Sequence, residues 1–180
     1  MNHIVHVEGR DDIGCVIIGD GPDYDRLRAM SEDLKLTEHI EFTGYMSGAP
    51  LLQTLSACDI GVIPDPPNVC NDKLSMNKVF EYMALGMPFV QFDLEQAKID
   101  AGDAAHIVPD STPECLAQGM MDLLADPERR AQMTAYATDR AKREFHWDIE
   151  KHSMLDAYRT LLKPKEQSKV SGSASISEST

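Results

Sequence analysis

Lys78 and Glu81 are the residues of this sequence that could most directly bind a ligand. They lie one helical turn apart in SMNKVFEYMALGMPFV, residues 75–90, which follows a loop rich in Pro, Asn and Asp. The free N–H groups at the start of a helix attract anions, and a lysine beside them adds positive charge. A phosphate could therefore bind there, while Glu81 could accept hydrogen bonds from the hydroxyl groups of a sugar. The residues expected to begin this helix are Ser75, Met76 and Asn77.

The same spacing also fits an ordinary ion pair between Lys78 and Glu81 on the surface of a helix. Opposite charges at positions i and i+3 are common on exposed helices and contribute only about 0.2–0.5 kcal/mol. Taken alone, the spacing favours the ion pair over a binding site, so both interpretations stay open at this point.

Two glycine-containing turns could bring a backbone close to a ligand. The turn GDGPD lacks the third glycine of the dinucleotide-binding fingerprint and by itself favours a tight turn. The segment FTGYM ends an apolar run, and its tyrosine could stack on a base or cover the edge of a sheet. The candidate binding residues in these turns are Gly19, Asp20, Gly21, Pro22, Gly44, Tyr45 and Met46.

Composition and charge exclude several classes of function. The chain has 180 residues, and its 17 Lys and Arg are outnumbered by 30 Asp and Glu, which gives a formal net charge of −13. Nucleic-acid binding is therefore not expected, and any anion must be held by a local site. The cysteines and histidines are spaced neither as metal ligands nor as a redox pair. No segment has the length of an apolar membrane span or the pattern of a signal peptide, which predicts a cytoplasmic protein.

Short apolar segments alternate with amphipathic segments along the chain. This pattern predicts an α/β fold with a Rossmann-like parallel sheet and helices on both faces. The expected strands are residues 15–19, 39–44, 60–64, 88–92 and 105–109. The expected helices are the helix end at residues 1–8, about 22–34, 49–58, 75–85, 113–124, 127–145 and 147–162, with Gly86 ending the one that carries Lys78. Residues 1–163 are expected to form one domain, and the Ser-rich tail, residues 164–180, is expected to be disordered.

Five segments in order resemble the C-terminal half of a glycosyltransferase family 4 enzyme: VIIGDGPDYDRL, IEFTGYM, LLQTLSACDIGVIP, NKVFEYMALGMPFV and FHW…AYRTLL. The resemblance extends from about Val16 to Leu162, and K-x-F-E-Y-M-A-x-G-x-P is its most specific part. It implies a retaining enzyme of the GT-B type, built from two Rossmann-like domains. In such enzymes the C-terminal domain binds the nucleotide-diphospho-sugar donor, and the acceptor lies mostly on the other domain.

The resemblance also implies roles for individual residues. Glu81 would hold the ribose hydroxyls of the donor, and Asn77 and Lys78 would face its diphosphate, so Glu81 and Lys78 are the expected catalytic residues. The turns at residues 19–22 and 44–46 would line the nucleotide pocket, and Glu95 stands near another acidic position of the family. Amides and cations would stabilise the charge of the leaving diphosphate, without a cofactor or an obligatory metal.

The sequence departs from the family pattern in two respects. Many members carry a second glutamate eight residues before the one that Glu81 matches, where this chain has Lys73. By the same resemblance, we expect the chain to begin inside the helix that follows the family's first strand and to lack the acceptor domain. We therefore expect a domain incomplete at its N-terminus, with an empty strand position in the sheet and an exposed apolar surface at Met1, Ile4 and Val5.

These departures predict a donor-binding half that is inactive alone and whose partner is a separate acceptor-domain chain. The alternative is a non-catalytic nucleotide-binding or interaction module with the same fold. A flavodoxin-like regulatory domain is disfavoured, because no acidic cluster for a phosphorylated aspartate follows the first expected strand.

Overall fold

The computed structural model describes residues 1–162, which belong to two compact units. The first unit comprises Met1–Phe145, and the second begins at His146. The tail that was expected to be disordered lies outside the described residues.

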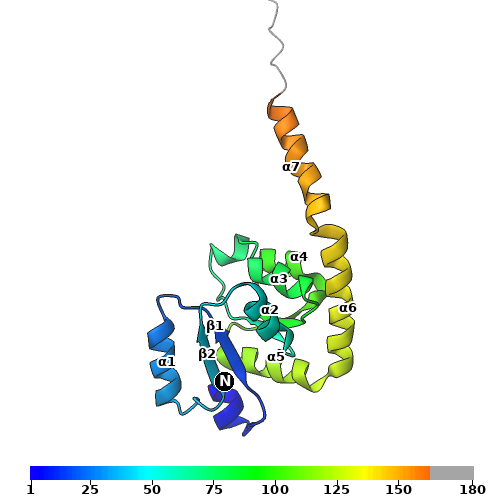
Figure 1. Ribbon diagram of the computed structural model, residues 1–180. Coiled ribbons are helices and arrows are strands. Elements are labelled where there is room, and N and C mark those ends of the chain that lie inside the picture. The colour runs from blue at the N-terminus through cyan, green and yellow to red at the C-terminus, as the bar shows by residue number, and fades with distance from the viewer. Residues whose placement is uncertain (163–180) are drawn as a thin grey trace, which may run out of the picture. The chain divides into compact units, whose positions relative to one another are not determined.

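The first unit confirms the predicted α/β fold, with parallel strands and helices around them (Figure 1). One sheet pairs β1 (Cys15–Ile18) with β2 (Ile40–Gly44). The other has the order β3-β4-β5 and contains β3 (Gly61–Ile63), β4 (Phe89–Phe92) and β5 (Ala105–Val108). All five strands lie where the apolar segments predicted them, and each is slightly shorter than its segment.

The predicted single sheet is divided between β1 and β3. The amide of Cys15 donates to the carbonyl of His39 beside β2, and the amide of Gly61 donates to the carbonyl of Pro88 beside β4. Backbone amides and carbonyls alternate in direction along a strand, so those of Val16 in β1 point away from β2, and those of Val62 in β3 point away from β4. Within residues 1–162 no strand pairs with these free edges of β1 and β3.

Helices with short connections surround the strands. Their bounds are α1 (Tyr24–Asp33), α2 (Gly48–Ser56), α3 (Asn77–Ala84), α4 (Glu95–Ala101), α5 (Pro113–Ala125) and α6 (Pro127–Glu144), with the shorter helices η1 (His3–Val7), η2 (Asn71–Lys73) and η3 (Gly102–Ala104). The Thr112 hydroxyl and the Asp126 carboxylate cap α5 and α6, and each cap is followed by the proline predicted for a first turn. Gly86, at φ +66°, follows the end of α3 as predicted.

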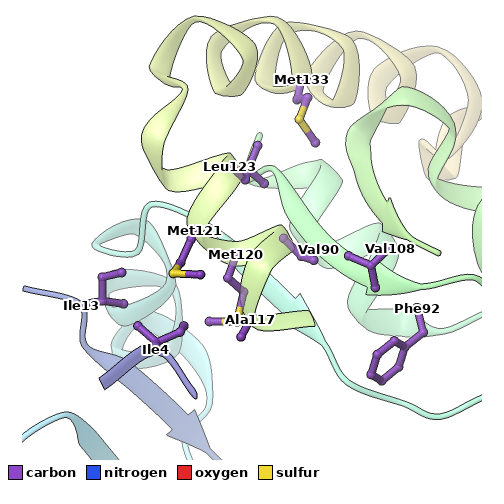
Figure 2. Packing of buried hydrophobic residues seen from close by; sticks show 10 residues of the cluster. All are labelled: Ile4, Ile13, Val90, Phe92, Val108, Ala117, Met120, Met121, Leu123 and Met133. Carbon is purple, nitrogen blue, oxygen red and sulfur yellow. The ribbon is translucent and has the colours of Figure 1, made fainter. Parts of the chain in front are cut away.

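Two apolar cores cover the two faces of the three-stranded sheet. Val90 and Phe92 of β4 face the core that α5 closes, shown in Figure 2, and this core also contains Ile4 and Ile13 near the N-terminus. Successive strand residues point to opposite faces, so Phe89 lies in the other core with residues of α3, α4 and α6. Ile4 is completely buried, which shows that the expected exposure of this residue was wrong. It is buried because η1 contacts α5.

The second unit contains α7 (Trp147–Leu161). Its first turn is capped by His146, whose Nδ1 accepts a hydrogen bond of 3.2 Å from the Asp148 amide. None of the helices formed by residues 1–162 has the length and apolar character needed to cross a membrane.

Candidate functional site

The two glycine turns meet at the carboxyl ends of β1 and β2. The Gly19 amide donates a hydrogen bond of 2.8 Å to the Gly44 carbonyl. Gly19 has φ +138° and Gly44 has φ +69°, a region that residues with a side chain rarely adopt. A Cβ atom at either position would meet nothing within 4 Å. The backbone conformation, and not crowding, therefore explains the glycines at these two positions.

The residues around these glycines present open surface. Asp20, Gly21 and Pro22 are exposed, and the turn then leads into α1. The side chain of Tyr45 is 73% exposed, so it does not cover the sheet and is free to stack on a planar group. Met46 is half-buried, and the Thr54 hydroxyl of α2 contacts its sulfur at 3.9 Å.

A second group of predicted residues lies at the start of α3. Met76, at the N-cap position, is buried and provides no side-chain cap for the helix. Ser75 and Asn77 are exposed beside it. The first turn of α3 contains no acidic residue, unlike the first turns of α5 and α6. The Val79 amide donates to the Met76 carbonyl at 3.0 Å, and the amides of Asn77 and Lys78 are available to an external hydrogen-bond acceptor.

Lys78 forms its ion pair with Asp65, and not with Glu81. Its Nζ atom lies 2.5 Å from Oδ2 of Asp65, which follows the last residue of β3 by two positions. Within residues 1–162 no ion pair joins Lys78 to Glu81, so the i, i+3 interpretation is wrong. Sequence reasoning missed Asp65. The available signal was its position as the first carboxylate after the end of β3.

Glu81 is exposed one turn further along α3. The ring of its neighbour Tyr82 packs against Gly61 of β3. A Cβ atom on Gly61 would lie 2.6 Å from the Tyr82 ring, so the glycine makes room for this contact. Burial raises the pKa of Tyr82, as do the Glu81 carboxylate and, more weakly, Cys58, while a hydrogen bond with the backbone of Val62 lowers it. The position of α3, and with it that of Lys78 and Glu81, is therefore set by packing against β3 together with contacts to α4 and α6.

Two hollows of the surface do not coincide with these residues. One of about 690 Å³ lies beside α1 and includes Gly14 and His39, at the amino ends of β1 and β2. Another of about 330 Å³ lies between η1, α1 and the β1–β2 pair. Parallel α/β sheets bind ligands at the carboxyl ends of their strands, so the position of these hollows does not support a donor site there.

The structure thus places the predicted residues at the carboxyl ends of strands, in two groups that belong to different sheets. Within residues 1–162 no hydrogen bond joins the glycine turns to the start of α3. Lys73 is exposed in η2, and Glu95 is exposed at the first position of α4. No group of three or more His, Cys, Asp or Glu side chains in this part of the chain is arranged to hold a metal ion.

Comparison with known proteins shows relatives over most of the chain. Residues 1–126 match the family model described as "Glycosyl transferases group 1". The phosphatidyl-myo-inositol mannosyltransferase of Mycolicibacterium smegmatis is 27% identical over 169 residues, which cover 93% of this chain and 42% of that protein.

Solved structures share the fold. A glycosyltransferase from Rickettsia africae superposes with a TM-score of 0.76 at 17% identity, over 91% of this chain and 44% of the other. The Anabaena protein Alr3699/HepE, in complex with UDP-glucose, gives a TM-score of 0.71 at 16% identity, over 84% of this chain and 42% of the other. The chain spans less than half the length of these relatives. Because the family model covers more than half of the sequence, the chain belongs to the group 1 glycosyl transferases and is a GT-B glycosyltransferase domain.

Proposed function

We propose that this domain binds a nucleotide-diphospho-sugar at the carboxyl ends of its strands and is the donor-binding half of a retaining glycosyltransferase. The observation that carries the proposal is the start of α3, where an uncapped helix N-terminus, Lys78 and the exposed Glu81 lie within one turn. Anionic oxygens of a diphosphate fit the first two groups, and a vicinal diol fits the carboxylate.

The proposed catalytic contribution of these residues is electrostatic. When the sugar leaves the diphosphate, negative charge increases on the phosphate oxygen, and the amides of α3 with the Lys78 ammonium would stabilise it. Glu81 would hold the ribose and so fix the position of the diphosphate. The glycine turns at Gly19 and Gly44 would let the nucleotide lie close to the backbone. The acceptor would be supplied by an acceptor domain outside residues 1–162.

The names of the relatives support a nucleotide-sugar donor. The Mycolicibacterium protein is a mannosyltransferase, and the Anabaena protein was crystallised with UDP-glucose. Lys73, at the position where many family members have a glutamate, favours a second candidate, a module that binds nucleotide without transferring sugar. The two candidates share the same binding site and differ only in turnover.

Calorimetric titration with UDP, GDP and ADP tests the shared site. We expect the chain to prefer one nucleotide, and Glu81→Ala to weaken that binding by about 1.5–3 kcal/mol, because charge-assisted hydrogen bonds to the ribose are lost. The matched control is Glu32→Ala, which removes an exposed helical glutamate on α1 beside the hollow at the amino ends of the strands. Absence of binding by the folded chain, or equal effects of the two substitutions, would contradict the proposal.

A further inference from the structure

We propose that the Asp65 carboxylate pairs with the Lys78 ammonium when no donor is bound, and that the donor diphosphate displaces it. We call Asp65 a stand-in anion in this sense. The inference rests on the proposed function and adds a residue that regulates access to the same site. Asp65 would act through Lys78, so it is a positioning residue and not a catalytic one.

The ion pair is accessible to solvent. Nζ of Lys78 and Oδ2 of Asp65 are 2.5 Å apart, and the two side chains are 44% and 30% exposed. An ion pair of this exposure contributes little to stability, because water and salt compete with it. The geometry therefore suits an exchangeable partner better than a permanent structural link.

The location of Lys78 explains why it needs an anion. It is the second residue of α3, and a cation there is repelled by the positive end of the helix dipole. The first turn of α3 supplies no acidic residue and no side-chain cap. The compensating charge comes instead from Asp65, across the loop between β3 and α3. A diphosphate carries more negative charge than one carboxylate and can also accept from the helix amides, so it can replace Asp65.

The neighbouring strand offers a comparison. Asp93 immediately follows β4, whereas Asp65 lies two positions after β3, and Oδ1 of Asp93 lies 2.5 Å from Nζ of Lys98. Lys98, however, lies in the last turn of α4, where the helix dipole favours a cation. That lysine needs no external anion. The two pairs have the same chemistry at the same edge of the sheet, and only the pair at α3 has an electrostatic reason to bind a ligand.

The test is titration of wild type, Asp65→Asn and Asp93→Asn with UDP, GDP, ADP, pyrophosphate and uridine. Asp65→Asn should tighten binding of the preferred nucleoside diphosphate and of pyrophosphate about threefold or more, since the diphosphate no longer competes with a carboxylate. It should also steepen the salt dependence of that binding. Uridine, which lacks phosphate, should be unaffected by the substitution, and Asp93→Asn should leave diphosphate binding near the wild-type value.

The outcomes separate this inference from the proposed function. Nucleotide binding that Glu81→Ala weakens, with no tightening in Asp65→Asn beyond that in Asp93→Asn, overturns the stand-in anion and leaves the function. Tightened pyrophosphate binding in Asp65→Asn, without a preference among nucleotides or an effect of Glu81→Ala, supports the stand-in anion and overturns the function. Weaker binding in Asp65→Asn would overturn the stand-in anion, because Asp65 would then hold Lys78 in place for the ligand. No binding of any diphosphate by any variant overturns both.

Discussion

A substitution at Gly119 would test the packing between α5 and the three-stranded sheet. Gly119 is a buried residue in the middle of α5, where most sequences would favour a residue with better helix propensity. A Cβ atom at this position would lie 2.5 Å from Cγ1 of Val108, and 3.1 Å from both Cδ2 of His106 and Cγ1 of Val90. We therefore predict that Gly119→Ala destabilises the domain, although alanine is the better helix former.

The magnitude follows from two opposing effects. Replacing glycine by alanine inside a helix gains about 1 kcal/mol. Carbon atoms pack best at about 3.5–4.0 Å, so the new methyl must move α5 or the strands by about 1 Å. Overpacking of a buried site typically costs about 1–3 kcal/mol, and Val108, only 2% exposed, has no free space into which it can rotate. The expected net loss is therefore up to about 2 kcal/mol.

Equilibrium unfolding in urea, followed by far-ultraviolet circular dichroism, measures this change. Val108→Ala and the double variant complete a double-mutant cycle, because Val108→Ala removes the methyl group that the new side chain would meet. In the Val108→Ala background the same glycine substitution should cost at least about 1 kcal/mol less, since contacting residues are not additive. The dependence of unfolding free energy on urea should stay unchanged in all variants.

An equal effect of Gly119→Ala in both backgrounds would refute this account. It would mean that the contact with Val108 does not determine the need for glycine at this position. An increase in stability in the wild-type background would show in addition that α5 moves without cost.

Two more predictions concern β3 and β5. Gly61→Ala should destabilise the domain by about 1–3 kcal/mol in urea unfolding, because the new methyl overlaps the Tyr82 ring, and a penalty unchanged by Tyr82→Leu would contradict this. Burial, with a further contribution from the Arg129 guanidinium, lowers the pKa of His106 below 6.5, and Asp122 opposes this only in part. The unfolded chain then binds the proton more readily, so the urea midpoint should fall as the pH drops below about 6.5 and level off below the folded pKa. His106→Gln should flatten this dependence, and an unchanged pH profile would refute the assignment.

The alternation of apolar and amphipathic segments was sufficient to predict the five strands and the longer helices, α1, α2, α3, α5, α6 and α7, but not the short helices η2 and η3. Strands of parallel sheets tend to be buried on both faces and therefore appear as short apolar runs. The strand β4, buried at all its positions, is the clearest case, whereas β1 and β2 remain partly exposed. The positive φ angles at Gly19, Gly44 and Gly86 also agree with the turns that their positions indicated. Local chemistry determines these features, so a sequence displays them directly.

Features that depend on distant residues were not predictable in this way. The partner of Lys78 is thirteen positions away, across a loop without periodicity, whereas Glu81 was the obvious neighbour on the helix. The burial of Ile4 depends on contact between η1 and α5, which are far apart in the sequence. The position of the hollows depends likewise on how α1 packs on its sheet.

The division of the sheet has a thermodynamic consequence for ligand binding. Gly19 directly follows β1 and Gly44 ends β2, and within residues 1–162 no further strand pairs with either side of this two-stranded sheet. Such a pair is only marginally stable by itself. This pair should open locally far more often than the three-stranded sheet beneath α3, and its amides should exchange with solvent sooner. Any nucleotide that uses the glycine turns must then order this region as it binds, and its apparent affinity is reduced by the fraction of molecules in which the pair is open.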